Sequence, residues 1–121
     1  MERDLKLRTK TFALRIIKLY SALPRRGDAK VLGTQILKSG TSVGAHYREA
    51  CRAKSDADFI SKVEGALQEL DETAYWLELI GEAEILPTNR LLPLHDEAEE
   101  LIAILVTIVT KVKRKKSRGA Q

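Results

Sequence analysis

Histidine and cysteine are the side chains most often used for catalysis or metal binding near neutral pH, and this chain has few of them. Its 121 residues include two histidines, His46 and His95, and one cysteine, Cys51. No Ser/His/Asp arrangement is recognisable around either histidine, and one cysteine with two histidines makes a poor metal site. We therefore predict no catalytic residue, no metal site and no cofactor.

Two further patterns could carry chemistry, and neither predicts an enzyme. The segment 40–44 contains two glycines, Gly40 and Gly44, but it has no lysine at the place that a phosphate-binding P-loop requires. The acidic residues Glu69, Asp71 and Glu72 are close together, but neighbouring acids on a helix usually form a solvated face. The chain is predicted to be non-enzymatic.

Positive charge is the feature that indicates a function. The net charge is +4, with eight Lys or Arg against two acids in residues 1–27 and five against two in 28–54. Residues 55–86 reverse this balance, with nine acids against one lysine. Basic segments can bind phosphate backbones, although helices of opposite charge can also face one another or face water.

The candidate nucleic-acid contacts lie in three places: the first loop, the end of the second helix and the C-terminal tail. Arg48 and Arg52 are four residues apart and share one helix face. The complete set is Arg25, Arg26, Arg48, Arg52, Lys54, Lys111, Lys113, Arg114, Lys115 and Lys116.

Apolar residues recur with the helical period and predict four helices, at about 4–22, 28–53, 56–81 and 88–113. Ser55 and Asp58 resemble a capping box, and Gly81 could start a C-terminal cap. Pro93 predicts that the regular part of the last helix begins near residue 92 or 94. The fold class is all-α, an antiparallel up-down four-helix bundle. Residues 1–121 form one domain with a basic, flexible tail at 113–121.

The second helix contains three glycines, Gly33, Gly40 and Gly44, each costing about 1 kcal/mol relative to alanine. Close approach of another helix explains this cost, so Gly40 and Gly44 are predicted helix-packing residues. A kink near 39–42 is the alternative.

The segment 101–109 is apolar on nearly every side, whereas an outer helix of a bundle should keep a polar face. We therefore predict a homo-oligomer whose interface includes Ile104 and Ile108. Tyr75 and Trp76 widen the apolar stripe of the third helix and are predicted to join this interface. The alternative is that they fill a corner of the core.

No membrane segment is expected, because 101–109 is too short to cross a bilayer and the charged N-terminus is unlike a signal peptide. With its single cysteine, the chain is expected to be cytoplasmic.

Residues 35–53, which include Ser39-Gly40-Thr41-Ser42-Val43-Gly44-Ala45-His46-Tyr47, resemble the signature of the bacterial four helix bundle protein family. Residues 58–63 and 69–79 are similar to the family's third helix, and the resemblance covers about residues 8–112. This family includes proteins encoded in intervening sequences of 23S ribosomal RNA genes. More distantly, it includes the accessory variability determinant of diversity-generating retroelements.

The resemblance implies an antiparallel up-down bundle that assembles into a ring-like homopentamer. In the retroelement branch the ring is positively charged and binds nucleic acid and the reverse transcriptase. For the intervening-sequence branch, RNA association is suspected from gene location. We therefore expect an oligomer that binds nucleic acid, in particular RNA, with ribosomal RNA or a reverse transcriptase as candidate partners. The alternative is a protein-interaction scaffold whose charges pair between subunits.

Overall fold

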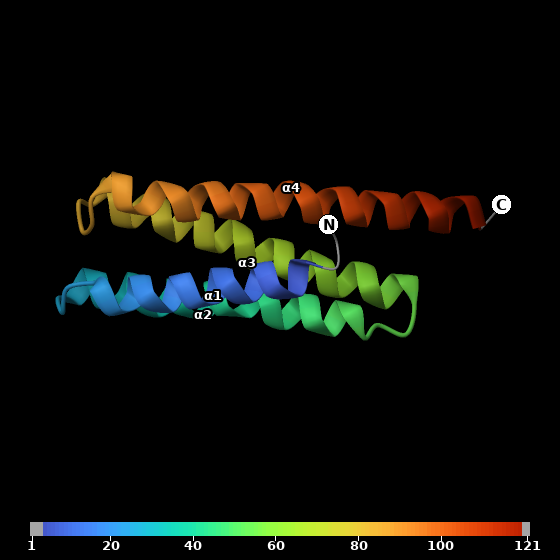
Figure 1. Ribbon diagram of the computed structural model, residues 1–121, viewed down its shortest axis with the longest axis horizontal. Helices are drawn as coiled ribbons and strands as arrows, with labels where there is room; N and C mark the ends of the chain where they lie inside the picture. Colours follow the sequence, from blue (N-terminus) through green and yellow to red (C-terminus); the bar gives the residue numbers. More distant parts are fainter. Residues whose placement is uncertain (1–3, 120–121) are drawn as a thin grey trace.

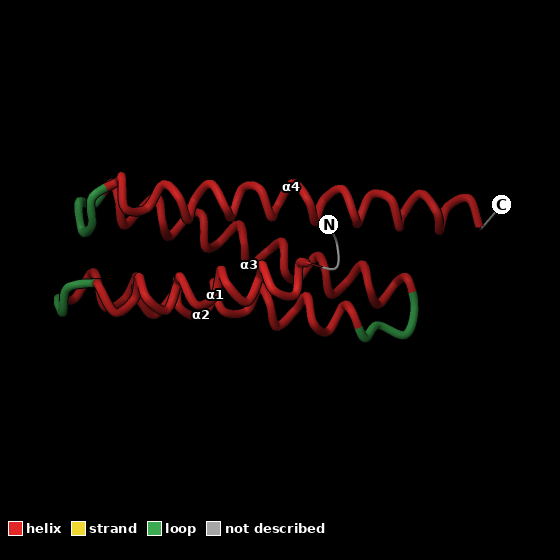
Figure 2. The backbone as a smooth tube through the Cα atoms, in the orientation of Figure 1, coloured by secondary structure: helices red, strands yellow, loops and turns green. Residues whose placement is uncertain are grey.

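The computed structural model describes residues 4–119, and all secondary structure in this range is helical. The four helices are α1 (Leu5–Ala22), α2 (Gly27–Cys51), α3 (Asp56–Glu82) and α4 (Thr88–Gly119), joined by short loops (Figures 1 and 2). The predicted all-α class is therefore confirmed.

The ends of the first three helices lie close to the predicted positions. After α1, the extended backbone of Leu23 precedes Pro24, which disfavours helical geometry in the residue before it. At the start of α3, Ser55 Oγ accepts a hydrogen bond from the Asp58 backbone N–H at 3.0 Å, as the capping pattern predicts. The cap expected at Gly81 is not formed there, since α3 continues to Glu82 and Glu84 takes the left-handed conformation.

The fourth helix begins at the predicted residue and is longer than predicted at its C-terminal end. It begins at Thr88 and accommodates Pro93 in its second turn, so the expected start of the regular part near residue 92 or 94 was wrong. It continues to Gly119, so residues 113–119 are helical, where the sequence predicts a flexible tail; residues 120–121 lie outside the described range. Lys113 Nζ lies 3.0 Å from Glu64 and Lys115 Nζ 3.8 Å from Asp56, and these ion pairs hold the extension against α3.

Consecutive helices run in opposite directions. Near one end of the α1–α2 pair Thr9 lies against Gly44, and near the other Tyr20 lies against Gly33. The α3–α4 pair shows the same reversal, with Lys113 paired to Glu64. Contact between α1 and α4 is much the smallest of the four helix pairings. Figure 1 accordingly shows α1 beside α2 and, across the molecule, α4 beside α3.

The core is aliphatic and continuous through all four helices. Three buried hydroxyls lie within it, and each is hydrogen-bonded: Thr9 donates to the Leu5 carbonyl at 2.7 Å, Thr73 to the Glu69 carbonyl at 2.8 Å, and Ser39 to the Ile36 carbonyl at 3.4 Å. These bonds satisfy the hydroxyls inside an apolar environment.

The four residues predicted to form an oligomer interface have different environments. Ile108 is only 7% exposed because it lies on the same face of α4 as Leu101 and Leu105 and packs in the core of its own chain, so its assignment to an interface is corrected. Ile104 and Trp76 are partly buried, whereas Tyr75 is 53% exposed. Between residues 4 and 119, no helix is both long and apolar enough to span a bilayer.

Candidate nucleic-acid interface

Gly40 and Gly44 of α2 lie at its contact with α1. A Cβ atom added to Gly40 would lie 2.7 Å from Ile16 Cγ1, and one added to Gly44 would lie 3.2 Å from Thr9 Oγ1. α2 runs without interruption through both glycines. The glycines therefore lie at a close helix–helix contact, and the segment 39–42 remains helical.

A groove follows this contact on the outer side of the α1–α2 pair. It encloses about 360 Å³, and small residues form much of its lining. We call it the α1–α2 groove, and its lining residues are Lys6, Thr9, Lys10, Ala13, Thr41, Gly44, Ala45 and Arg48.

Three cations face one another across the α1–α2 groove. Lys6 and Lys10 are one turn apart on α1, and Arg48 lies on α2. All three are exposed, and none forms an ion pair with a residue in the described range 4–119. Among the described residues 4–119, no acidic side chain lines the groove. The positive charge here is therefore uncompensated by the described part of the chain.

The basic edge of α2 continues away from the groove. Lys30 lies on the same face of α2 as Arg48, about five turns or 27 Å away. Lys30 and Arg25 line a second hollow beside the α1–α2 loop. Positive charge is therefore present near both ends of this face of α2.

The structure separates the cations that the sequence analysis selected. Arg25 and Arg26 lie at the α1–α2 loop, at the opposite end of the bundle from Lys54 (Figure 1). Arg26 Nε is 2.9 Å from Asp28 Oδ1, so part of its charge is compensated locally. The loop that follows Arg52 and contains Lys54 packs beside Val112 of α4, which brings it close to the basic end of the chain.

The basic end of α4 is divided into paired and unpaired residues. Lys113 and Lys115 form the ion pairs with Glu64 and Asp56 described above, so they are weaker candidates for phosphate contacts than the sequence predicts. Lys111, Arg114 and Lys116 are exposed and form no ion pair with the described part of the chain.

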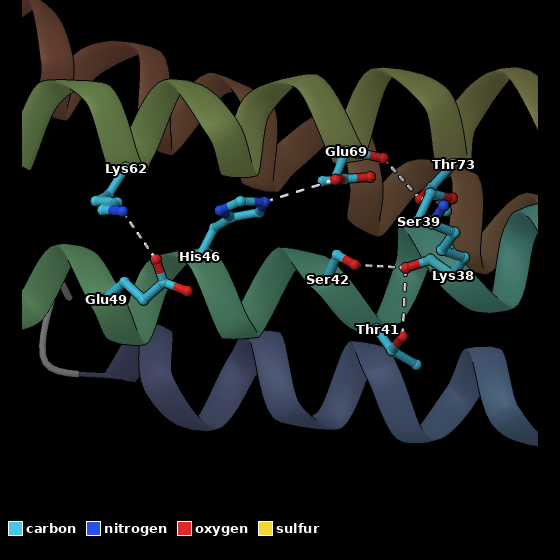
Figure 3. A network of polar contacts seen from close by, with 9 residues as sticks. All are labelled: Lys38, Ser39, Thr41, Ser42, His46, Glu49, Lys62, Glu69 and Thr73. Carbon is cyan, nitrogen blue, oxygen red and sulfur yellow. Dashed lines mark hydrogen bonds and ion pairs between the residues drawn. The ribbon is translucent and has the colours of Figure 1, made fainter.

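Elsewhere, opposite charges do face one another between helices, as the alternative interpretation of the charge pattern expects. Arg8 binds Glu97 through two hydrogen bonds of 2.7 and 3.0 Å and lies 3.1 Å from Glu100. The hydrogen bond to Glu97 is the main cause that raises the pKa of Arg8. Between α2 and α3, the Lys62 ammonium lies 3.0 Å from Glu49 and lowers the pKa of that carboxyl (Figure 3).

Sequence reasoning missed Lys6 and Lys10 as members of the groove. Their spacing of four residues in a strongly basic segment was a usable signal. Which side of α1 faces α2, however, depends on the packing of the two helices. The same packing places Arg8 against α4 and removes it from the unpaired cations.

Each histidine lies in a polar contact with a carboxylate of another helix. His46 Nε2 is 3.6 Å from Glu69, and Gly65 leaves room for its ring between α2 and α3 (Figure 3). His95 Nε2 is 2.8 Å from Glu78. Among residues 4–119, no three His, Cys, Asp or Glu side chains are grouped as a metal site would need.

Comparison with known proteins agrees with this helical fold. The family model described as 23S rRNA-intervening sequence protein matches residues 3–107. A protein of unknown function from the S23 ribosomal protein family of Bacteroides thetaiotaomicron VPI-5482 has a similar solved structure. It is 40% identical, with a TM-score of 0.81, and the alignment covers 86% of this chain and 96% of the other. None of the curated proteins matches the chain. The chain belongs to the 23S rRNA-intervening sequence protein family.

Proposed function

We propose that this protein is a non-enzymatic nucleic-acid-binding protein that contacts phosphates through the α1–α2 groove. The observation that carries the proposal is the set of three cations, Lys6, Lys10 and Arg48, that no acid among residues 4–119 compensates. Such a site gains free energy when a phosphate backbone replaces the counterions that otherwise surround it.

The nucleic acid proposed is RNA. Support comes from the family description, which links these proteins to intervening sequences of 23S ribosomal RNA. The groove contains no aromatic side chain on which a base could stack, and its charged residues contact phosphates best. Binding should therefore be mainly electrostatic, with little dependence on base sequence.

A homo-oligomer, with five subunits implied by the family resemblance, would strengthen this binding. Several weak contacts on one assembly add to a much higher overall affinity when one nucleic acid engages them together. Exposed apolar residues on α1, α3 and α4, among them Leu14 at 57%, Tyr75 at 53% and Val106 at 47%, support assembly.

The second candidate is a protein-interaction scaffold that binds no nucleic acid. It is favoured by the interhelical pairs at Arg8 and Lys62, because they show that this sequence can use opposite charges to join helices. In that case the free cations of the groove would pair with acids of another subunit.

Charge reversal in the groove tests the proposal. The variant Lys10→Glu with Arg48→Glu removes one cation from each wall, and Arg114→Glu with Lys116→Glu is the matched control with the same change in net charge. Affinity for a fluorescently labelled RNA is measured by anisotropy across a salt series. The groove variant should lose at least about 10-fold in affinity for every sequence tested. Its slope of log affinity against log salt should fall by about 2.

The control variant should lose less affinity and keep a steeper salt dependence than the groove variant. Circular dichroism of both variants checks that the helices are intact. Equal losses in the two variants would show that only net charge matters, which contradicts a groove site. Absence of binding by the parent protein at low salt would favour the scaffold.

A further inference from the structure

We propose that the α1–α2 groove takes a single strand of RNA, in preference to a duplex or to single-stranded DNA. The inference rests on the proposed function and adds the class of nucleic acid to it. Two observations carry it. The first is the concave shape of a groove with cations on both walls, and the second is the hydrogen bond that the Thr41 hydroxyl makes within its own helix.

The shape of the site favours one strand. Lys6 and Lys10 lie on the α1 wall and Arg48 on the α2 wall, while Ala45 and Gly44 provide little side-chain bulk between them. A single strand lying in the groove can place its phosphates within reach of both walls. A duplex presents a wide convex surface, so it contacts the rims of the groove more readily than the small residues between its walls.

The spacing of the cations also suits a strand that follows α1. Lys6 and Lys10 are separated by four helical residues, a rise of about 6 Å. This rise is similar to the distance between neighbouring phosphates along an extended strand. Each lysine can therefore contact a different phosphate of the same strand.

The groove also contains an acceptor for the ribose 2′-hydroxyl. Thr41 Oγ1 donates its proton to the Leu37 carbonyl of its own helix at 2.7 Å, so it offers only lone pairs to a ligand. A phosphate oxygen has no proton to donate and cannot use these lone pairs. A 2′-hydroxyl can donate to them, and this group is what distinguishes RNA from DNA. Thr41 is partly exposed in the groove and can be reached.

The first test changes the shape of the groove without changing its charge. Ala45→Leu fills the groove, and Ala103→Leu on α4 is the control, because Ala103 is also exposed on a helix but lies outside the groove. Anisotropy is measured with single-stranded RNA and with duplex RNA of the same length. We expect the parent to prefer the single strand, and Ala45→Leu to lower single-strand affinity at least about 5-fold while Ala103→Leu leaves it unchanged.

The second test removes the acceptor. Thr41→Val keeps the shape of the side chain and lacks the hydroxyl, and Thr107→Val is the control, since Thr107 makes the same local bond to the Ala103 carbonyl at 2.9 Å on α4. The ratio of affinities for RNA and DNA single strands of the same sequence is the readout. Loss of one hydrogen bond should reduce this ratio about 2- to 10-fold in Thr41→Val alone.

The outcomes separate this inference from the proposed function. A parent protein that binds no nucleic acid at low salt overturns both. A parent that binds duplex and single strand equally, with no effect of Ala45→Leu, overturns the single-strand inference but leaves phosphate binding intact. An RNA-to-DNA ratio that is unchanged in Thr41→Val overturns the role of its hydroxyl.

Discussion

At the scale of single residues, the tightest constraint on the fold is at Gly40. Its missing side chain leaves room for Ile16, and a Cβ there would be 2.7 and 2.9 Å from two atoms of that residue. Both atoms are branches close to the α1 backbone, so they cannot move away as freely as the end of a long side chain. This position therefore determines how closely α1 and α2 approach, and so the depth of the groove outside them.

We expect Gly40→Ala to destabilise the protein even though alanine is the better helix former. Overpacking costs about 1–3 kcal/mol, and the gain in helix propensity is about 1 kcal/mol, so the net loss should be about 1 kcal/mol. Gly27→Ala is the control, since a Cβ there has no neighbour within 4 Å. Urea unfolding of both variants is the measurement. Equal stability of the two variants would show that the contact between α1 and α2 can widen without loss of stability.

Arg8 is the residue that joins the two helices with the least mutual contact. Replacing it by methionine keeps an apolar stem but leaves Glu97, whose side chain is 19% exposed, without its partner. We expect a loss of about 1 kcal/mol in the free energy of unfolding. Arg26→Met is the matched control, because Arg26 and Asp28 are both more than half exposed and should contribute less than about 0.5 kcal/mol. A larger loss in the control would contradict the assignment.

At the scale of elements, the last turns of α4 have two roles. Lys113 and Lys115 bind acids of α3, and Lys111, Arg114 and Lys116 remain available to a ligand. Part of the extension therefore contacts the start of α3, and the rest is a basic segment exposed to solvent. A nucleic acid could use it without entering the groove.

Deleting residues from Lys113 onward separates these contributions. We expect the truncated protein to keep most of its affinity for single-stranded RNA and to show a shallower salt dependence, since it loses cations but keeps the groove. Anisotropy over the same salt series is the measurement, beside the Arg48→Glu with Arg52→Glu variant. If truncation abolishes binding and the double variant binds like the parent, the tail is the site and the groove proposal is wrong.

At the scale of the whole molecule, charge is distributed unevenly between its two helix pairs. The outer face of α1 and α2 is basic, while most acids lie on α3 and the first half of α4. Phosphates should therefore approach the α1–α2 side. Exposed apolar side chains also lie on several helices, and two of them, Tyr75 on α3 and Val106 on α4, are not among the residues that line the groove.

We expect the protein in solution to be a homo-oligomer with a mass several times 13.6 kDa by light scattering. Val106 lies in the apolar run of α4 and is 47% exposed, so Val106→Glu should reduce this mass by placing a charge in an apolar contact. Val31→Glu is the control, because Val31 is 62% exposed on α2, away from the predicted interface. A parent protein that is monomeric at micromolar concentration would refute assembly.

The sequence by itself determined the helices. The period of Leu5, Phe12, Ile16 and Leu19, the stop at Pro24 and the cap at Ser55 are local signals, because helix formation depends on residues a few positions apart. In α4, the same kind of signal failed at Pro93 and at the C-terminal end. The proline was accommodated near the start of the helix, and ion pairs to α3 accompany the continuation to Gly119.

Only the tertiary structure decided which charges are free and which apolar residues are covered. Lys111 and Lys113 lie two residues apart in the same basic segment. Lys113 pairs with Glu64, whereas Lys111 forms no ion pair with the described part of the chain. Lys10 and Arg48 are far apart in the sequence, and the close packing of α1 on α2 places them across one groove. Charge compensation depends on distances between side chains of different helices, and no local pattern contains those distances.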